Sequence, residues 1–163
     1  IVIEKLRETG MIIEKTGKNA VIAAGAKKII ATDIKTLPFP GFATDMQAQF
    51  CALLSKAEGV SFVSETVFEN RFMHISELNR LGANIKIDHN TVVIQGVSKL
   101  GGAQIMSPDL RAGAALVLAG LAAEGETELL RIYHIDRGYE SIETKFAALG
   151  ARIERMKSEG FDI

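Results

Sequence analysis

The sequence has little cysteine, and this scarcity excludes several kinds of site. Cys51 is the single cysteine among 163 residues, so the chain cannot close an internal disulfide, and no cysteine or histidine cluster stands at zinc-ligand spacing. We therefore predict no metal site and, because a free thiol fits a reducing compartment, a cytoplasmic protein. Cys51 lies in an apolar segment without a basic neighbour, which favours a buried thiol over a nucleophile.

Long apolar runs and an excess of one charge are also absent. The longest strongly apolar run, residues 112–123, is broken by glycines and is too short to cross a bilayer, and the segment IVIEKLRETG lacks the apolar core of a signal peptide. The 19 basic and 20 acidic residues leave a formal net charge of −1, so no overall field attracts nucleic acid or an anionic membrane. We expect neither as a partner, and local arginines must supply any anion binding.

Two nucleotide-binding patterns are missing from the chain. Neither GxxxxGK[ST] nor GxGxxG occurs, which argues against a nucleoside triphosphatase or a nicotinamide enzyme. With 47% hydrophobic and 24% charged residues, the composition is that of one ordinary folded domain.

What the sequence does contain is an internal repeat, in which a segment starting at Asp45 can be laid over one starting at Asp109. Each copy begins with an acid, passes through Ala-Glu-Gly and then an arginine at the same spacing, and ends in Leu-Gly-Ala-x-Ile. These landmarks are residues 57–59, 71 and 81–85 in one copy and 123–125, 137 and 149–153 in the other. The amino-terminal LRETGMII resembles the tail of a third copy whose front part is absent.

Each copy is expected to fold as strand, helix, strand, helix, strand, strand. Residues 27–36 and GAQIMS predict the first strands, helical spacing of apolar residues from Met46 to Leu54 predicts a helix closed by Gly59, and VSFVSETV predicts a strand. A second helix face closed by Gly82 and a hairpin turning at residues 88–90 follow. The predicted class is α/β (α+β), one partial domain made of an incomplete first unit (1–26) and two βαβαββ units (27–100 and 101–163).

The acid of the first copy, Asp45, is expected at a helix start. Thr44 and Gln47 have the spacing of a capping box, which would leave Asp45 in the first turn. An acid there stabilises the helix dipole by about 0.3–1 kcal/mol, so capping alone is one interpretation. The stiff lead-in PFPGFAT favours the other, a positioned catalytic base, because proline restricts its own backbone and the residue before it.

The acid of the second copy is expected one position deeper in its helix. Ser107 followed by Pro108 predicts Ser107 as the cap and leaves Asp109 inside the first turn.

Three arginines are candidates for anion binding. Arg71 and Arg137 occupy equivalent places in the two copies, each behind an acid, Glu69 or Asp136, that could hold the guanidinium, and Arg111 lies one turn into a helix. Each could also be a solvated surface charge. Together, near helix amino ends, they would suit a small substrate carrying phosphate and carboxylate.

At FATDMQAQF, SETVFENRFMH, DLRA and RIYHIDRGYE the sequence closely resembles the UDP-N-acetylglucosamine enolpyruvyl transferases (1-carboxyvinyltransferases), over essentially the whole chain. That family has two domains, each of three βαβαββ units, in an architecture called the inside-out α/β barrel. The resemblance implies that this chain is the carboxyl-terminal part of a longer protein, in which it forms part of one barrel domain.

The resemblance further implies transfer of the enolpyruvyl group of phosphoenolpyruvate to the 3′-hydroxyl of UDP-N-acetylglucosamine in peptidoglycan biosynthesis, with release of phosphate and without a cofactor. The resemblance assigns Asp45 as general acid/base and Arg71, Arg111 and Arg137 as the phosphoenolpyruvate clamp, with Arg137 counted with Asp45 as catalytic. It places Asp109 at the domain interface and Thr44, Val67 and Phe68 at the nucleotide sugar. All eight, Asp45 and Asp109 included, are expected to bind substrate.

Two family features are missing, the reactive cysteine of the other domain, which Cys51 does not match, and an amino-terminal lysine-asparagine pair. We therefore expect the chain to be inactive alone, to need the amino-terminal domain as its partner, and to self-associate if the incomplete unit leaves sheet edges open. The alternatives are a non-catalytic ligand-binding module, a small-anion regulatory domain, and a sibling enolpyruvylshikimate-phosphate synthase, which does not share TDMQAQ and HIDRGYE as a set.

Overall fold

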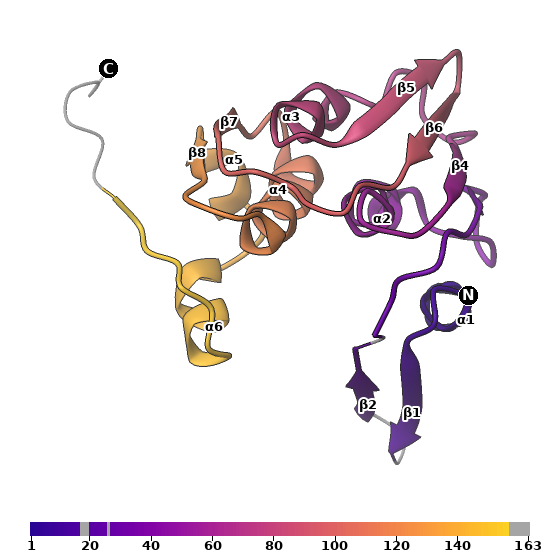
Figure 1. Cartoon of the computed structure of the whole chain (residues 1–163), viewed down its shortest axis with the longest axis horizontal. Coiled ribbons are helices and arrows are strands. Elements are labelled where there is room, and N and C mark those ends of the chain that lie inside the picture. The colour runs from indigo at the N-terminus through magenta and orange to yellow at the C-terminus, as the bar shows by residue number, and fades with distance from the viewer. Residues whose placement is uncertain (17–19, 26, 157–163) are drawn as a thin grey trace.

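The structure is a computed structural model that describes residues 1–16, 20–25 and 27–156 (Figure 1). The middle of the chain forms a four-stranded sheet with two helices. Its elements are β3 (Ile34–Lys35), the 3₁₀ turn η1 (Thr44–Met46), α2 (Gln47–Leu54), β4 (Val60–Ser64), α3 (His74–Arg80), β5 (Asn84–Asp88) and β6 (Thr91–Gln95). The element order predicted for residues 27–100 is confirmed.

The sheet has the strand order β3-β4-β6-β5, with β3 parallel to β4 and the other pairs antiparallel. The predicted hairpin is present, with Asp88 opposite Thr91 across a two-residue turn. Val63, Val92 and Ile94 are buried while their neighbours along β4 and β6 are more exposed. This alternation fixes the register, because a slip of one residue would turn the apolar face outward.

The strand expected over residues 27–36 is shorter than predicted, because only Ile34 and Lys35 join the sheet. Ahead of them, side chains replace part of the backbone ladder. The Thr32 N–H donates to the hydroxyl of Ser61, and the carboxylate of Asp33 accepts from the Phe62 N–H. The segment therefore runs along β4 without forming a regular strand.

The carboxyl-terminal part contains β7 (Gln104–Met106), α4 (Leu110–Ala122), β8 (Glu128–Leu130), α5 (Tyr133–Asp136) and α6 (Ile142–Ala148). Strands β7 and β8 pair in parallel. The two closing strands expected in this unit are absent from residues 101–156, where the last six residues have no regular secondary structure and pair with no strand. An isolated strand has no ladder to stabilise it. The rest of that expectation, residues 157–163, lies outside the described residues.

Three helices end in the same way, which supports the internal repeat. Residues Gly10, Gly82 and Gly150 follow α1 (Val2–Glu8), α3 and α6 with φ of +89°, +89° and +94°. After each glycine an N–H returns to a carbonyl in the last helical turn, as in a Schellman motif; the pairs are Met11 to Leu6, Ala83 to Leu78 and Ala151 to Phe146. The first of these leads into the antiparallel hairpin β1 (Ile12–Thr16) and β2 (Ala20–Ala24), as α3 leads into β5 and β6 (Figure 1).

Gly59 does not play the role predicted for it. It has a positive φ of +111°, but α2 already ends at Leu54, and a turn over residues 55–57 and a single β-bridge at Glu58 separate that helix from Gly59. The left-handed residue therefore opens the strand and does not close the helix.

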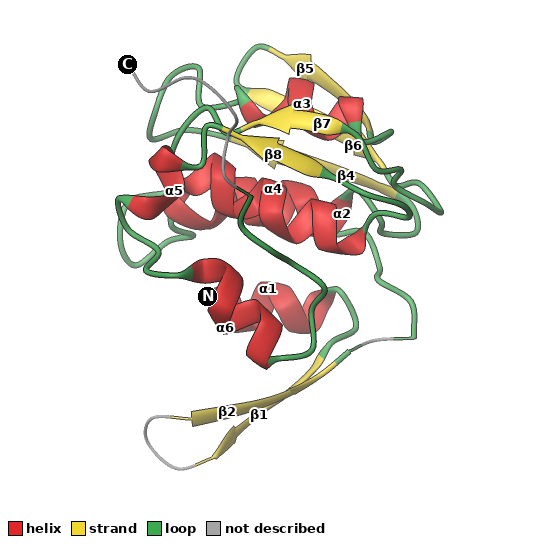
Figure 2. Cartoon of the chain, turned by 90° about the vertical axis from the view of Figure 1, so that its left-hand side faces the viewer, coloured by secondary structure: helices red, strands yellow, loops and turns green. Residues whose placement is uncertain are grey.

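The core lies between the sheet and a pair of adjacent helices, α2 and α4 (Figure 2). Alanines on the buried face of α4, including Ala115 and Ala119, have little side-chain bulk, which lets α2 approach closely. Cys51, in α2, is part of this core and has no exposed surface, and burial, reinforced by the charge of Glu65, raises the pKa of its thiol. The prediction of a buried thiol is confirmed.

Within residues 1–16, 20–25 and 27–156, no helix combines the length and the hydropathy needed to cross a membrane.

Candidate active site

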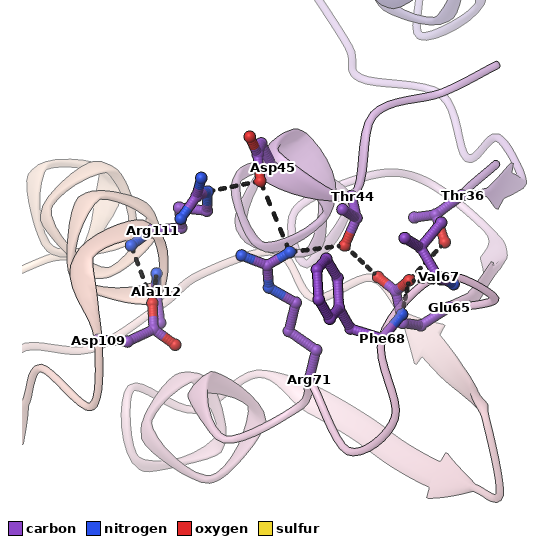
Figure 3. A network of polar contacts seen from close by, with 10 residues as sticks. All are labelled: Thr36, Thr44, Asp45, Glu65, Val67, Phe68, Arg71, Asp109, Arg111 and Ala112. Atoms are coloured by element: carbon purple, nitrogen blue, oxygen red, sulfur yellow. Dashed lines mark hydrogen bonds and ion pairs between the residues drawn. The ribbon is translucent and has the colours of Figure 1, made fainter. Parts of the chain in front are cut away.

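Asp45 lies in the short turn η1, where the stiff lead-in meets α2. The lead-in is anchored by Phe42, which is buried and packs edge-to-face on Phe50 with ring centroids 5.0 Å apart. The carboxylate of Asp45 is half exposed. Its Oδ1 lies 2.6 Å from Nε of Arg111 and 3.6 Å from Nη1 of Arg71 (Figure 3). The acid is therefore held between two guanidiniums that come from different parts of the chain.

The capping box predicted from Thr44 and Gln47 is wrong. The Thr44 hydroxyl donates to Oε2 of Glu65 at 2.7 Å and accepts from Nη1 of Arg71 at 2.8 Å, and no side chain caps η1 or α2. Hydrogen bonds to ionised groups are stronger than a bond to a backbone amide, so the distant partners outcompete the local one. Thr44 thus belongs to the site.

The cap predicted for the second acid is also wrong. Asp109 is itself the N-cap of α4, because its Oδ1 accepts from the N–H groups of Arg111 and Ala112 at 2.8 and 2.9 Å. The hydroxyl of Ser107 donates to the Asp109 carbonyl. This cap fixes the start of the helix, and with it the position of Arg111.

Arg71 is held by the site and not by its sequence neighbour. Its guanidinium contacts Thr44 and Asp45 as above, and its Cζ lies 4.9 Å from the centre of the Phe68 ring, in a cation–π contact. The expected pairing with Glu69 is not seen. The turn before Arg71 contains Asn70 with a φ of +58°, a left-handed conformation that asparagine tolerates.

Arg137 differs from Arg71 in having no hydrogen bond or ion pair to any residue that the structure describes. The expected partner, Asp136, instead binds Arg155 through two hydrogen bonds of 2.9 and 2.7 Å, which lower the pKa of Asp136. The guanidinium of Arg137 remains exposed.

A cleft of about 500 Å³ joins these groups. It is lined by Arg71, Pro108, Asp109, Leu110, Arg111, His134 and Arg137. Asp45 does not line the cleft, but its carboxylate pairs with two arginines that do. Three guanidiniums at one opening are chemically able to pair with a small anion that carries more than one acidic group.

Two residues of the expected nucleotide-sugar site lie beside this cleft. Val67 and Phe68 follow β4, and both are more than a third exposed. Their backbone N–H groups donate to Oε1 of Glu65 at 2.8 and 3.1 Å (Figure 3). The structure thus brings all eight expected residues into one connected region.

Glu65, which no sequence motif pointed to, connects this region. Glu65 is 3% exposed, and burial by itself raises the pKa of its carboxyl group. Hydrogen bonds from Thr36, Thr44 and the N–H groups of Val67 and Phe68 outweigh burial, so the net effect lowers the pKa of Glu65. The available sequence signal was a glutamate directly after a strand rich in β-branched residues. A carboxylate buried at such a strand end needs several hydrogen-bond donors around it.

His74 lies behind the cleft at the start of α3. It is 2% exposed, and its Nε2 has no partner among the described residues. Burial lowers the pKa of His74 to about 4, with the charge of Asp109 opposing and that of Arg71 reinforcing the effect. A neutral imidazole therefore lies beside the charged groups of the site.

The described ranges contain no group of three or more histidine, cysteine, aspartate or glutamate side chains arranged to hold a metal ion.

Comparison with known proteins identifies the class to which this fold and cleft belong. The model of the EPSP synthase (3-phosphoshikimate 1-carboxyvinyltransferase) family matches residues 1–146, and the chain belongs to this family.

Two curated relatives show which members of the family this chain is similar to. The UDP-N-acetylglucosamine 1-carboxyvinyltransferase of Trichlorobacter lovleyi is 60% identical over 153 residues, 93% of this chain and 36% of that protein. The protein of the same name from Gloeobacter violaceus is 56% identical over 94% of this chain and 34% of its own length. The chain spans about a third of the length of the curated relatives it matches.

Solved structures agree with this assignment. The enolpyruvyl transferase NikO from Streptomyces tendae superposes with a TM-score of 0.85 at 29% identity, over 94% of this chain and 35% of that one. EPSP synthase from Acinetobacter baumannii gives 0.58 at 22% identity over 78% of this chain and 31% of its own, a likeness of fold alone. The expected fold class, a mixed α/β partial domain of the enolpyruvyl transferase type, is confirmed.

Proposed function

We propose that the protein containing this chain transfers the enolpyruvyl group of phosphoenolpyruvate to the 3′-hydroxyl of UDP-N-acetylglucosamine and releases phosphate, in the cytoplasmic synthesis of peptidoglycan. The names of the relatives described above support this assignment. The observation that carries it is the carboxylate of Asp45 between Arg71 and Arg111, beside a cleft that Arg137 also lines.

The chemistry requires an anion to be held and a proton to be moved. Arg71, Arg111 and Arg137 would hold the phosphate and carboxylate of phosphoenolpyruvate by bidentate hydrogen bonds. The sugar 3′-oxygen adds to C2 of phosphoenolpyruvate, its proton leaves to a base, and C3 gains a proton. Loss of a proton from C3 then expels phosphate. We assign one of these transfers to Asp45, a proposal supported by its ion pairs with Arg71 and Arg111.

The other residues serve binding and placement. Thr44, Val67 and Phe68 adjoin the cleft and would contact the nucleotide sugar, with the exposed Phe68 ring offering a flat surface. Asp109 would lie at the interface with the amino-terminal domain, which supplies the rest of the site, and its capping of α4 would hold Arg111 there.

Phosphate release by the full natural polypeptide tests the proposal. We expect release with phosphoenolpyruvate and UDP-N-acetylglucosamine together, none with either alone, and none when shikimate 3-phosphate is the acceptor. Release with shikimate 3-phosphate would replace the proposal by the sibling reaction. The 163-residue chain by itself is expected to release none, because it spans about a third of its relatives.

We also propose that the isolated chain self-associates. Among the described residues, β3 and β8 each have one edge without a partner strand. Such edges pair readily with other chains. Sedimentation should detect dimers or larger species, and a single monomeric species at high concentration would contradict this.

A further inference from the structure

A buried carboxylate lies directly behind the arginine–aspartate pair of the site. Glu65 follows the last residue of β4 and is 3% exposed. Its Oε1 accepts from the Thr36 hydroxyl at 2.7 Å and from the N–H groups of Val67 and Phe68. Its Oε2 accepts from the Thr44 hydroxyl at 2.7 Å (Figure 3). A buried charge this well satisfied is fixed in place.

The bond to Thr44 determines which way that hydroxyl points. A hydroxyl carries one proton and two lone pairs. Because the proton of Thr44 is directed to Glu65, only lone pairs remain for the N–H of Arg71, which donates to the same oxygen at 2.8 Å. An acceptor at position 65 therefore makes Thr44 an acceptor for the guanidinium.

The same carboxylate also acts on Arg71 by a second route, through Phe68. It pins the N–H groups of Val67 and Phe68, and the Phe68 ring lies 4.9 Å from Cζ of Arg71. Arg71 thus contacts a hydroxyl and an aromatic ring, and Glu65 accepts hydrogen bonds from both of the residues that carry them.

We propose that Glu65 is a positioning residue that, through Thr44 and Phe68, sets the orientation in which the guanidinium of Arg71 meets Asp45 and the substrate anion. The identity of that anion as the phosphate of phosphoenolpyruvate rests on the proposed function. The positioning itself rests on the contacts of Glu65.

The substitution Glu65→Gln keeps the hydrogen bonds at one oxygen of the carboxylate and changes the one at the other. An amide oxygen at the Oε1 position keeps the bonds from Thr36 and the loop, while an NH₂ group at the Oε2 position donates where the carboxylate accepted. The Thr44 oxygen then accepts from both the new NH₂ group and Arg71, and its proton has no partner in the cluster, so the orientation of the hydroxyl is no longer fixed. The shape of the side chain is kept.

Glu77→Gln is the matched control. Glu77 is also buried, and its Oε2 accepts a backbone N–H, that of Met106. The chemical change is the same, but no contact links Glu77 to Thr44 or Phe68 in the part of the chain that the structure describes.

Binding of inorganic phosphate to the 163-residue chain, measured by calorimetry, is the primary readout because it needs no catalysis. We expect Glu65→Gln to weaken phosphate binding about tenfold, the value of one charged hydrogen bond, and Glu77→Gln to change it less than about twofold. In a Thr44→Val background, Glu65→Gln should have little further effect, because the hydroxyl through which it acts is gone.

Three results would overturn the proposal. The first is an equal loss of phosphate affinity in both glutamine variants, tracking their melting temperatures, which would reduce Glu65 to a structural role. The second is full additivity of Glu65→Gln and Thr44→Val. The third is no phosphate binding by the unsubstituted chain, which would leave Arg71 no anion to meet.

The full natural polypeptide then separates this inference from the proposed function. There, Glu65→Gln should raise KM for phosphoenolpyruvate more than it lowers kcat, because the anion contact is made in the ground state as well as in the transition state. If the unsubstituted protein releases no phosphate, the proposed reaction fails, while the calorimetric result still decides the role of Glu65.

Discussion

The Nε atom of Arg111, in the first turn of α4, lies 2.6 Å from Oδ1 of Asp45, in the turn that opens α2. The packing of α2 on α4 brings together two residues that occupy matching regions of the internal repeat. A carboxylate held this way keeps its place before substrate arrives, so changing its charge without changing its shape isolates its chemical role.

Asp45→Asn should abolish most activity of the full natural polypeptide. The amide retains the shape of the side chain but cannot exchange a proton as a base, and such groups contribute about 100- to 10,000-fold. Phosphate release should fall by that order, while binding of UDP-N-acetylglucosamine by calorimetry is retained. Asp88→Asn, at the exposed turn of the β5–β6 hairpin, is the control and should behave like the unsubstituted protein. Equal activity in both variants would remove Asp45 from the chemistry.

Arg137→Ala and Arg71→Ala should both weaken phosphate binding, but only Arg71→Ala should lower the stability of the fold. Arg137 has no partner in the described part of the chain, so its loss should weaken phosphate binding about tenfold and leave the melting temperature unchanged. Arg71→Ala should weaken binding similarly and also lower the free energy of unfolding by roughly 1–2 kcal/mol, since it deprives Thr44 and Phe68 of a partner.

Arg80→Ala, on the exposed side of α3, provides the control for both arginine variants. If phosphate binds all three variants with the affinity that it has for the unsubstituted chain, the cleft is not an anion site.

Much of the fold could be predicted from the sequence, because the signals involved are local. The left-handed Gly82 after an apolar helix face, and the turn between two β-branched runs at His89, need only neighbouring residues to be recognised. The failures involve distant partners. The strand before Ile34 is shortened by side-chain bonds to β4, and the unpaired segment after Gly150 has no strand to join in the described residues.

The sequence selects residues that the structure brings together, but it does not predict the contacts that they make. Repeat position and family resemblance select Asp45 and the arginines, yet local reasoning assigned Thr44 to a helix cap and Asp136 to Arg137. Both assignments failed because a charged partner far along the chain, Glu65 or Arg155, forms the stronger bond. Sequence spacing alone does not show such partners.

His74 should make stability depend on pH between about 4 and 6.5. Its pKa is lowered from an ordinary value of 6.5 to about 4 in the folded chain, so over that interval the unfolded chain binds more protons. The free energy of unfolding should therefore fall by at most about 3 kcal/mol as pH is lowered from 6.5 to 4. Outside this window His74 should contribute no further pH dependence. Denaturant melts at several pH values measure it.

His74→Leu should remove most of this pH dependence, whereas His89→Asn, at the exposed hairpin turn, should retain it. Asparagine is chosen at position 89 because it tolerates the left-handed backbone there. An unchanged slope in His74→Leu would assign the pH dependence to other groups.

Gly113→Ala should disturb the contact that places Arg137 near Arg111. A Cβ at position 113 would overlap the hydroxyl of Ser107 and lie 2.6 Å from Cγ1 of Ile135, in α5. Both neighbours are buried, so α5 must shift away from α4, at a cost of about 1–3 kcal/mol that exceeds the gain in helix propensity.

Because Arg137 directly follows α5, the same shift should move its guanidinium and weaken phosphate binding by this chain in calorimetry. Gly101→Ala is the matched control, since a Cβ there would meet nothing within 4 Å and the backbone has no positive φ. We expect it to leave both stability and phosphate affinity near those of the unsubstituted chain. A stable Gly113→Ala variant with full phosphate affinity would show that the α4–α5 contact does not hold the third arginine of the cleft.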